Sequence, residues 1–510
     1  MSGLWLAHDG RHHWDEPSYL YAGLHLTPEQ IIAGRFQPSG IPDFTQGRIL
    51  HALFVKGVMT AAGDGPSGFH ALVAINFLMI VASFVLMFHI LRDLLPDLPE
   101  RRAAAFLLAM SPVILYLLFK ILADNEALFA ALVATYSLLE LARGGPRHLG
   151  FIAIAGLAIA ALTKNQMVFL PATCWAALVA FPVAGMDRRR LGYYGVGCGF
   201  AAFLLTLATL FFLGIPLHAY LASYLDLIDG DVPVIAKVVN IATELGALWL
   251  LLPFALLTPR RQELRAFGLW FLLAMAPFVF VINSIEARHV AVNLVAVGGL
   301  LALAIEAIEL RWRAWQRMSD GARCAVAVAA VVVLMAGNAL TLKIMPHRVQ
   351  LDQMQAMIQT LNARYGADRY ALLTSSGYTD FQLIRVLWPE VDARDVGTDT
   401  IFFRGDRPRE RALDWYTSSR HPNSIEDLRA LNRPLVYFGY RQTFAAENLR
   451  AIISYFSPSL ATRLLGEINL VDRLHTDATA WLWNSPELRL DPIAESGHYL
   501  AYEVKLSPAP

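Results

Sequence analysis

The sequence predicts a polytopic α-helical membrane protein that carries a soluble α/β domain at its C-terminal end. Of its 510 residues, 56% are hydrophobic and only 16% are charged, whereas soluble globular proteins carry about 25% charged residues. Long apolar runs alternate with short arginine-containing breaks between residues 69 and 342, and charges become frequent after Pro346. The 42 acidic residues balance the 42 lysines and arginines, so the net charge gives no indication of a nucleic-acid partner.

We expect a transmembrane module over 1–345, beginning with an extracytoplasmic segment over 1–68, and a soluble domain over 346–510. A membrane-spanning helix needs roughly 20 apolar residues. Ten segments meet this requirement, at about 70–91, 103–119, 125–142, 149–163, 167–185, 193–214, 241–257, 266–283, 290–308 and 323–342. Only Thr163–Gln166 separates the fourth from the fifth, which predicts a tight helical hairpin. The three cysteines lie inside apolar runs and indicate neither a disulfide nor a metal framework.

The arginines predict the orientation of the chain, because they gather in alternate loops. The arginine-containing loops hold Arg92, Arg101 and Arg102; Arg143 and Arg147; Arg188, Arg189 and Arg190; Arg260, Arg261 and Arg265; and Arg311, Arg313 and Arg317. The positive-inside rule places these loops in the cytoplasm. Residues 1–68, the aspartate-containing loop 215–240 and the chain after Pro346 then lie outside.

This orientation places residues 1–68 outside the membrane with no earlier helix or signal peptide to export them. We therefore expect that a first transmembrane helix precedes this sequence in the complete protein. The alternative is an N-terminal tail that the following helix translocates.

Three basic residues on the predicted outer side each lie at the mouth of a different helical hairpin, namely Lys120, Lys164 and Arg288. Sites in helix bundles lie between such ends, and converging cations there suit the phosphate of an anionic lipid headgroup. For any single lysine, the alternative is a side chain that reaches out to the phosphates of the surrounding lipids.

Acidic residues accompany these cations on the same predicted side. Asp15 and Glu16 lie in the first outer segment, and Asp124 and Glu126 lie at the outer end of the second hairpin. Both pairs precede helical patterns, so helix capping is the alternative interpretation. Carboxylates and cations together indicate a site that activates a hydroxyl group and stabilises a phosphate leaving group.

The order of these features resembles that of the GT-C membrane glycosyltransferases, which include the protein O-mannosyltransferases and the aminoarabinose transferases of lipid A. Asp15–Glu16 resembles the acidic pair in the first extracytoplasmic loop of that family. Thr27–Gly34 and the amphipathic Arg48–Ala62 resemble the membrane-lying helices of the same loop. Asp124 or Glu126 corresponds to the acidic residue that often precedes a helix in the second outer loop.

Two later motifs extend the resemblance over about 1–345. Leu162-Thr163-Lys164 resembles a Leu-Thr-Lys stretch of several bacterial members, and Ala287-Arg288-His289 resembles a late Arg-aromatic motif with His in place of Tyr. The chain departs from the family in lacking the expected first helix. It also has Ile41-Pro42-Asp43 where many members have a Pro-Pro pair.

The resemblance implies a GT-C-like bundle in a bacterial inner membrane, embedded among membrane lipids. It implies an inverting glycosyltransferase that moves sugar from a polyprenyl-phosphate donor to an extracytoplasmic glycan, lipid or protein acceptor. Asp15 would be the general base, and Glu16 with Asp124 or Glu126 would position substrate or keep Asp15 charged.

In this interpretation, basic residues on the predicted outer side would hold the donor phosphate. These are Lys164, Arg288, Lys120 and His289. Some family members use a divalent cation, and the carboxylates of this chain could support one, but no ligand spacing in the sequence requires a metal.

Two other function classes stay open. A transporter or flippase of lipid-linked sugars would also need outer cations, but the sequence shows neither an internal repeat nor ionisable residues near the bilayer midplane. The third class is a non-catalytic protein that presents the tail domain. In that domain we predict strands at Tyr370–Ser375, Leu435–Tyr440 and Tyr499–Leu506 and helices at Gln350–Tyr365 and Ala446–Phe456, and no catalytic motif.

Overall fold

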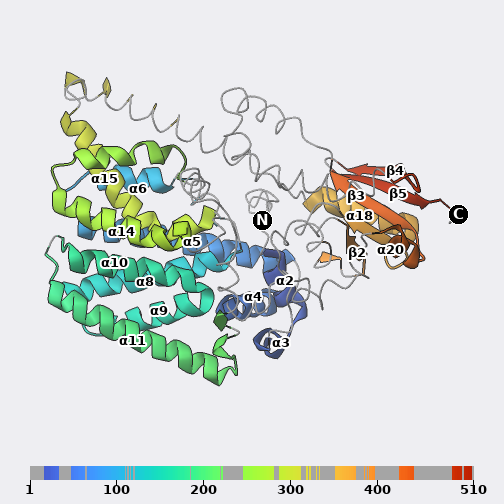
Figure 1. Ribbon diagram of the computed structural model, residues 1–510, viewed down its shortest axis with the longest axis horizontal. Helices are drawn as coiled ribbons and strands as arrows, with labels where there is room; N and C mark the ends of the chain where they lie inside the picture. The colour runs from blue at the N-terminus through green and yellow to red at the C-terminus, as the bar shows by residue number, and fades with distance from the viewer. Residues whose placement is uncertain are drawn as a thin grey trace. The chain divides into compact units, whose positions relative to one another are not determined.

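A computed structural model of the chain divides between Lys343 and Ile344 into a helical unit and a C-terminal unit that also takes in α2 (Glu16–His25) (Figure 1). The structure describes residues 16–33, 48–63, 66–109, 111, 114, 117–118, 121–183, 185–218, 220–221, 245–280, 287–311, 317–319, 321–322, 325, 329, 332, 351–374, 384, 387–388, 390–396, 424–440, 485–496 and 499–507.

The helical unit contains six stretches that are long and apolar enough to cross a membrane, within the part of the chain that the structure describes. They are Ser67–Leu94, Ala123–Ala142, Leu149–Ala180, Arg188–Phe212, Arg261–Phe280 and Val290–Arg311. The corresponding helices are α5 (Pro66–Leu94), α8 (Ala123–Ala142), α9 (Leu149–Lys164), α10 (Phe169–Ala180), α11 (Arg188–Phe212), α14 (Arg261–Phe280) and α15 (Leu294–Arg311).

These stretches correspond to the first, the third to sixth, the eighth and the ninth predicted segments. The second predicted segment begins as α6 (Arg101–Ala109), and the seventh is formed by the 3-10 helices η3 (Gly246–Leu250) and η4 (Leu252–Leu257). Most of the tenth segment lies outside the described residues. The two predicted membrane-lying helices are present as α3 (Pro28–Ile32) and α4 (Ile49–Ala62).

The predicted reversal between the fourth and fifth segments is present as a break in the long stretch Leu149–Ala180, but α9 and α10 both pack on α8 and do not form a tight pair with each other. Lys164 leaves the helical region, with φ −161° and ψ 100°, and the 3-10 turn η2 (Asn165–Val168) leads into α10. The end of α10 then leads back to the start of α11, where Trp175 of α10 donates a hydrogen bond to the carbonyl of Leu191 at 3.0 Å. The polar Thr163–Gln166 stretch therefore marks the point where the chain turns.

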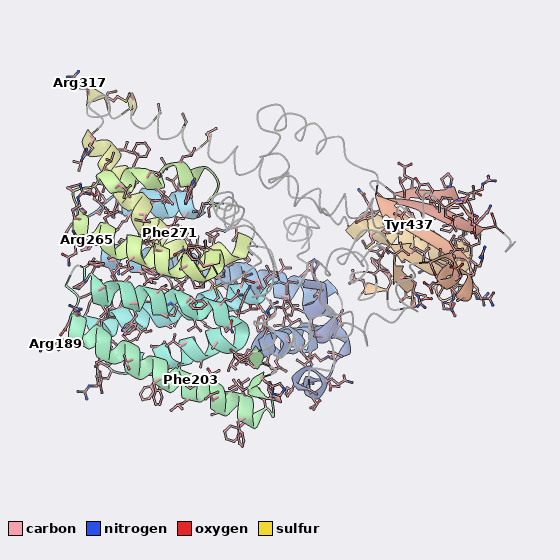
Figure 2. All side chains as sticks on the ribbon, viewed as in Figure 1. Arg189, Phe203, Arg265, Phe271, Arg317 and Tyr437 are labelled. Atoms are coloured by element: carbon pink, nitrogen blue, oxygen red, sulfur yellow. The ribbon has the colours of Figure 1, made fainter. Side chains whose placement is uncertain are left out.

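Two helices form the centre of the bundle and one lies at its edge. The apolar windows of α8 and of Val290–Arg311 are 78% and 83% buried, whereas that of α11 is 22% buried. Figure 2 shows Phe203 of α11 pointing away from the other helices, and its side chain is exposed. Such a helix presents apolar side chains to lipid, as expected at the rim of a membrane protein.

Small residues allow the central helices to approach closely. A Cβ atom added at Gly156 of α9 would lie 2.8 Å from the carbonyl oxygen of Ala130 in α8, and one at Gly299 of α15 would lie 2.3 Å from the ring of Phe267 in α14. The α8–α9 contact is the one that positions the candidate site described below.

The arginine-containing loops lie together at one end of the bundle. Arg143 bonds Asp93 at 3.2 Å, the guanidinium of Arg190 lies beside Gly144, and Arg260 bonds Glu306 at 2.8 Å. Figure 2 places Arg189, Arg265 and Arg317 on this same side of the helical unit. The arginines that recur in alternate loops of the sequence therefore lie together at one end of the folded bundle.

The C-terminal unit contains a five-stranded sheet in the order β2-β1-β3-β5-β4. The strands are β1 (Ala371–Thr374), β2 (Asp392–Asp395), β3 (Leu435–Tyr440), β4 (Leu488–Ser496) and β5 (Tyr499–Leu506). Strands β1, β2 and β3 pair in parallel, and β5 pairs antiparallel with β3 and β4. The helices are α18 (Leu351–Tyr365), which lies against β4 and β5, and α20 (Ile425–Ala430).

The sequence predicts the central strands and α18 but misses both edge strands. β2 reads Asp-Ala-Arg-Asp, and β4 contains Pro492 beside a register shift. Charged residues and proline are what natural sheets place at their edges, because these residues hinder further strand pairing. The same residues hide an edge strand from a search for apolar alternation. The predicted helix Ala446–Phe456 lies outside the described residues.

Candidate functional site

The end of the bundle opposite the arginine loops holds a buried ion pair between α8 and α9. The Nζ atom of Lys164 donates to Oδ1 of Asp124 at 2.6 Å, and both side chains are 1% exposed. The two helices are joined by a turn at Gly144, which has a φ of +92°. Asp124 and Lys164 lie equally many residues before and after this glycine. Two antiparallel helices that start from one turn therefore bring these two residues side by side.

Burying these two charges costs free energy, so their presence in the bundle calls for a functional explanation. Removing an ion from water carries a penalty of several kcal/mol, which a single partner rarely repays in full. Ionisable groups within a membrane bundle therefore mark functional sites by default. The 20 residues of α8 extend about 30 Å, which matches the thickness of the hydrocarbon core of about 30 Å. The pair consequently lies near one membrane boundary and Arg143 near the other.

A second buried carboxylate, Glu126, lies two residues after Asp124, within the first turn of α8. Its Oε1 atom is 3.0 Å from Nδ1 of His51 in α4, whose side chain is fully buried. Because a carboxylate only accepts, Nδ1 of His51 carries the hydrogen in this contact. α4 packs against α5 and α9, which brings His51 to the same end of the bundle.

Further polar side chains line the same region of α8. Asn125 donates to the side-chain oxygen of Asn76 in α5 at 3.0 Å and to the carbonyl of Leu117 at 3.1 Å. Gln166, in the turn after Lys164, is 4% exposed, and its Oε1 atom accepts no hydrogen bond within the described part of the chain. Polar groups thus concentrate where α4, α5, α8 and η2 meet.

The structure brings together three of the predicted site residues, Asp124, Glu126 and Lys164. Asp124 does not cap its helix, since α8 begins at Ala123 with Leu122 at the cap position and no side-chain cap. The capping interpretation is therefore wrong for Asp124. Its contact with Lys164 also differs from the prediction that these two residues would serve separate parts of the site.

The structure does not describe the side chains of the other five predicted site residues. Asp15 and Lys120 lie outside the described residues, and for Glu16, Arg288 and His289 only the backbone is described. Glu16 is the first residue of α2, and Arg288 and His289 lie in the 3-10 helix η5 (Ala287–Asn293). The roles predicted for these five residues stay predictions.

Among the described residues, no cluster of three or more His, Cys, Asp or Glu side chains could hold a metal ion. The two buried carboxylates are each occupied by a basic partner, Lys164 or His51. Cys174 and Cys198 are free and buried within the bundle.

His51 is the member of this cluster that sequence reasoning missed. A lone histidine in an amphipathic segment carries no pattern that distinguishes it from a structural residue. The available signal was its place on the inner side of α4, where Ile49, Ala52, Val55 and Met59 recur at helical spacing and are all buried.

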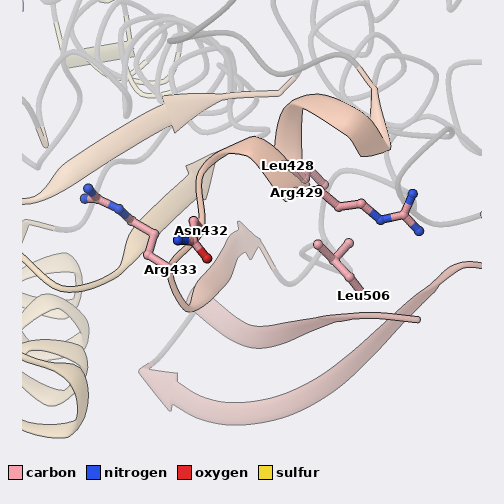
Figure 3. Close-up of a pocket in the computed structure, with 5 residues that line it drawn as sticks. All are labelled: Leu428, Arg429, Asn432, Arg433 and Leu506. Atoms are coloured by element: carbon pink, nitrogen blue, oxygen red, sulfur yellow. The ribbon is translucent and has the colours of Figure 1, made fainter. Parts of the chain in front are cut away.

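The C-terminal unit has a hollow of about 400 Å³ beside α20 (Figure 3). Arg429 and Arg433 line it, but Figure 3 shows their side chains pointing away from each other. Arg429 bonds Glu487 at 2.8 Å and Arg433 bonds Asp392 at 3.1 Å. Each cation is neutralised by its own partner, so the hollow gives no reason to assign chemistry to this unit.

The whole chain resembles ArnT from Cupriavidus metallidurans. The crystal structure of that protein bound to undecaprenyl phosphate matches with a TM-score of 0.54 at 12% identity, covering 98% of this chain and 95% of that one. Its crystal structure in the apo state matches with a TM-score of 0.51 at 14% identity over the same shares. No protein-family model and no curated protein sequence matches the chain. The chain is a multi-pass membrane protein with an ArnT-like fold, which confirms the predicted helical membrane bundle followed by a C-terminal α/β domain.

Proposed function

We propose that this protein is an inverting glycosyltransferase of the GT-C type, which transfers a sugar from a polyprenyl-phosphate donor to an extracytoplasmic acceptor. The observation that carries the proposal is the set of buried carboxylates with basic partners at one end of an ArnT-like bundle. The donor class is supported by ArnT, which has the same fold and whose crystal structure contains undecaprenyl phosphate.

The proposed reaction is a single displacement at the anomeric carbon. Asp15 takes the proton of the acceptor hydroxyl while the acceptor oxygen bonds to that carbon from the face opposite the phosphate. The bond between the carbon and the phosphate oxygen breaks, and its electron pair leaves with the polyprenyl phosphate. Lys164, Arg288, Lys120 and His289 would stabilise the charge on that phosphate, and Glu16, Asp124 and Glu126 would position the substrates.

The paired state of Lys164 adds a condition to this scheme. Because Asp124 neutralises its ammonium group at 2.6 Å, a phosphate would have to share Lys164 with Asp124. Lys164 would then act as a fixed donor, oriented in advance by the carboxylate, which is the kind of preorganised group that stabilises a developing negative charge.

The test is transfer by the purified full-length protein in nanodiscs, supplied with radiolabelled polyprenyl-phosphate sugars and cell-envelope extract as the source of acceptor. We expect label in the acceptor and stoichiometric release of polyprenyl phosphate. Asp15→Asn should lower transfer by roughly 10²-fold or more, because the amide cannot take the proton. Asn caps a helix about as well as Asp, so folding should be retained.

Asp187→Asn is the matched control, because Asp187 caps α11 at the arginine end through Arg189 and Arg190. It should leave transfer unchanged. Near-wild-type transfer by Asp15→Asn would remove Asp15 from the mechanism. In sealed proteoliposomes, movement of intact donor across the bilayer without release of polyprenyl phosphate would instead support the transporter class and contradict the proposal.

A further inference from the structure

The second oxygen of Glu126 is buried and has room for a further bond. The residue is 8% exposed, and its Oε2 atom accepts no hydrogen bond from any side chain or backbone group that the structure describes. A buried acceptor without a donor costs roughly 1–3 kcal/mol, and more when it is charged. Such an atom in the candidate site indicates a ligand that brings a donor.

The first oxygen of Glu126 is fixed by His51. The 3.0 Å contact between Nδ1 and Oε1 joins α4 to the first turn of α8, across 75 residues of sequence. His51 is itself held firmly, since its side chain is fully buried and its ring stacks on Phe54 with centroids 6.5 Å apart. One bond from a rigid donor restricts the rotation of the carboxylate and therefore aims its other oxygen.

Glu126 and Asp124 differ in what occupies them. Asp124 is bound by the ammonium group of Lys164 at 2.6 Å, whereas Glu126 is bound by the imidazole of His51 at 3.0 Å. Lys164 therefore does not need Glu126 as a counter-ion, and Glu126 remains available to a substrate.

We propose that His51 is a positioning residue, which orients Glu126 so that its Oε2 atom accepts a hydrogen bond from a hydroxyl group of the sugar substrate. The inference rests on the proposed transferase function and adds to it a residue on the first outer loop. No proton is transferred in this role. His51 supplies geometry, and Glu126 supplies the contact with substrate.

Two conservative replacements of His51 distinguish the position of its donor nitrogen from the volume of its side chain. The amide nitrogen of Asn lies as many bonds from Cβ as Nδ1 does, whereas that of Gln corresponds to Nε2. His51→Asn should therefore keep the bond to Glu126 and most of the turnover. His51→Gln should misplace the carboxylate and lower kcat on the order of 10- to 100-fold, with KM changing less.

A double-mutant cycle tests whether His51 acts through Glu126. In a Glu126→Gln background, His51→Gln should lower kcat no further, because the group that it positions is already lost. His89→Gln is the matched control, since His89 is a histidine of the same bundle that packs edge-on against Tyr136. It should leave kcat unchanged.

The measurements are turnover and KM with a polyprenyl-phosphate sugar, together with an unfolding curve for each variant in nanodiscs. Equal losses from His51→Asn and His51→Gln, or effects of His51→Gln and Glu126→Gln that multiply, would overturn the positioning role. If the wild-type protein itself transfers no sugar, the proposed function fails, which is a separate result from an active enzyme whose His51 and Glu126 are uncoupled.

Discussion

The two ends of the helical bundle hold charge in opposite ways. At one end, arginines form part-exposed pairs, such as Arg143 with Asp93 and Glu140 or Arg260 with Glu306. At the other end, Lys164 and Asp124 are both 99% buried. Part-exposed pairs are solvated and contribute little to stability, whereas buried pairs pay for desolvation.

The difference indicates what each end is for. Arginines beside a membrane surface set the orientation of the chain and can exchange partners with water and lipid headgroups. The buried ammonium of Lys164 cannot do so, because it is 1% exposed and is held against the Asp124 carboxylate. We interpret the arginine end as the end that orients the protein in the membrane, and the end with Lys164 and Asp124, called the chemical side below, as the end that holds the active site.

The largest expected effect comes from breaking the buried pair. Asp124→Asn removes the carboxylate that pairs with the buried ammonium of Lys164 at 2.6 Å and should lower the free energy of unfolding by about 3–5 kcal/mol. Replacing both residues, as in Asp124→Leu with Lys164→Met, should restore most of this stability, since apolar replacements of buried pairs are often neutral or stabilising. Reversible unfolding in mixed detergent micelles measures both.

Transfer activity then separates structure from function. If the pair belongs to the site, the double variant should be stable and inactive. A double variant that is stable and fully active would show that the pair has only a structural role.

A glycine contact between the two ends gives the next effect. The Cβ atom of Gly156→Ala would lie 2.8 Å from the carbonyl oxygen of Ala130, so α8 and α9 must separate. Overpacking of this kind costs about 1–3 kcal/mol, and we expect it to lower transfer by displacing Lys164. Gly150→Ala, in the same helix at the arginine end, meets no atom within 4 Å and should be neutral or slightly stabilising.

The arginine end should respond weakly. Arg143→Gln removes bonds to Asp93 and Glu140 at 3.2 Å each from a side chain that is 21% exposed. We expect a loss of about 1 kcal/mol or less, reduced further by salt. A loss as large as that of Asp124→Asn would contradict the distinction between the two ends.

The smallest effect concerns an exposed carboxylate in the C-terminal unit. Hydrogen bonds from Lys505 and Arg489 hold the pKa of Asp491 below its usual value. A lowered folded-state pKa stabilises the fold above the unfolded pKa of about 3.9 and ceases to do so as the pH falls through the folded value. The unfolding temperature of Asp491→Asn should therefore lie slightly below that of wild type at pH 7, with the gap closing below about pH 4. A gap that widens in acid would contradict the shift.

Apolar runs and their breaks predicted seven of the ten segments as long helices and the turn at Lys164, because the thickness of the bilayer sets the length of a spanning helix. The seventh segment, predicted as a spanning helix, is instead two short 3-10 helices. The charged site residues Asp124, Glu126 and Lys164 stood out for the same reason, as ionisable groups in apolar surroundings. The sequence did not reveal which of these side chains contact one another. The contact of Asp124 with Lys164 depends on the equal lengths of α8 and α9, and that of His51 with Glu126 on how α4 packs.

The most direct measurement is a density map of the full-length protein in nanodiscs with undecaprenyl phosphate added. We predict phosphate density beside Lys164, at the end of α8 and α9 where Asp124 and Glu126 lie, with the lipid chain leading away along the bundle. Phosphate density among Arg143, Arg190 and Arg260 at the opposite end would contradict the assignment of the chemical side and, with it, the proposed role of Lys164.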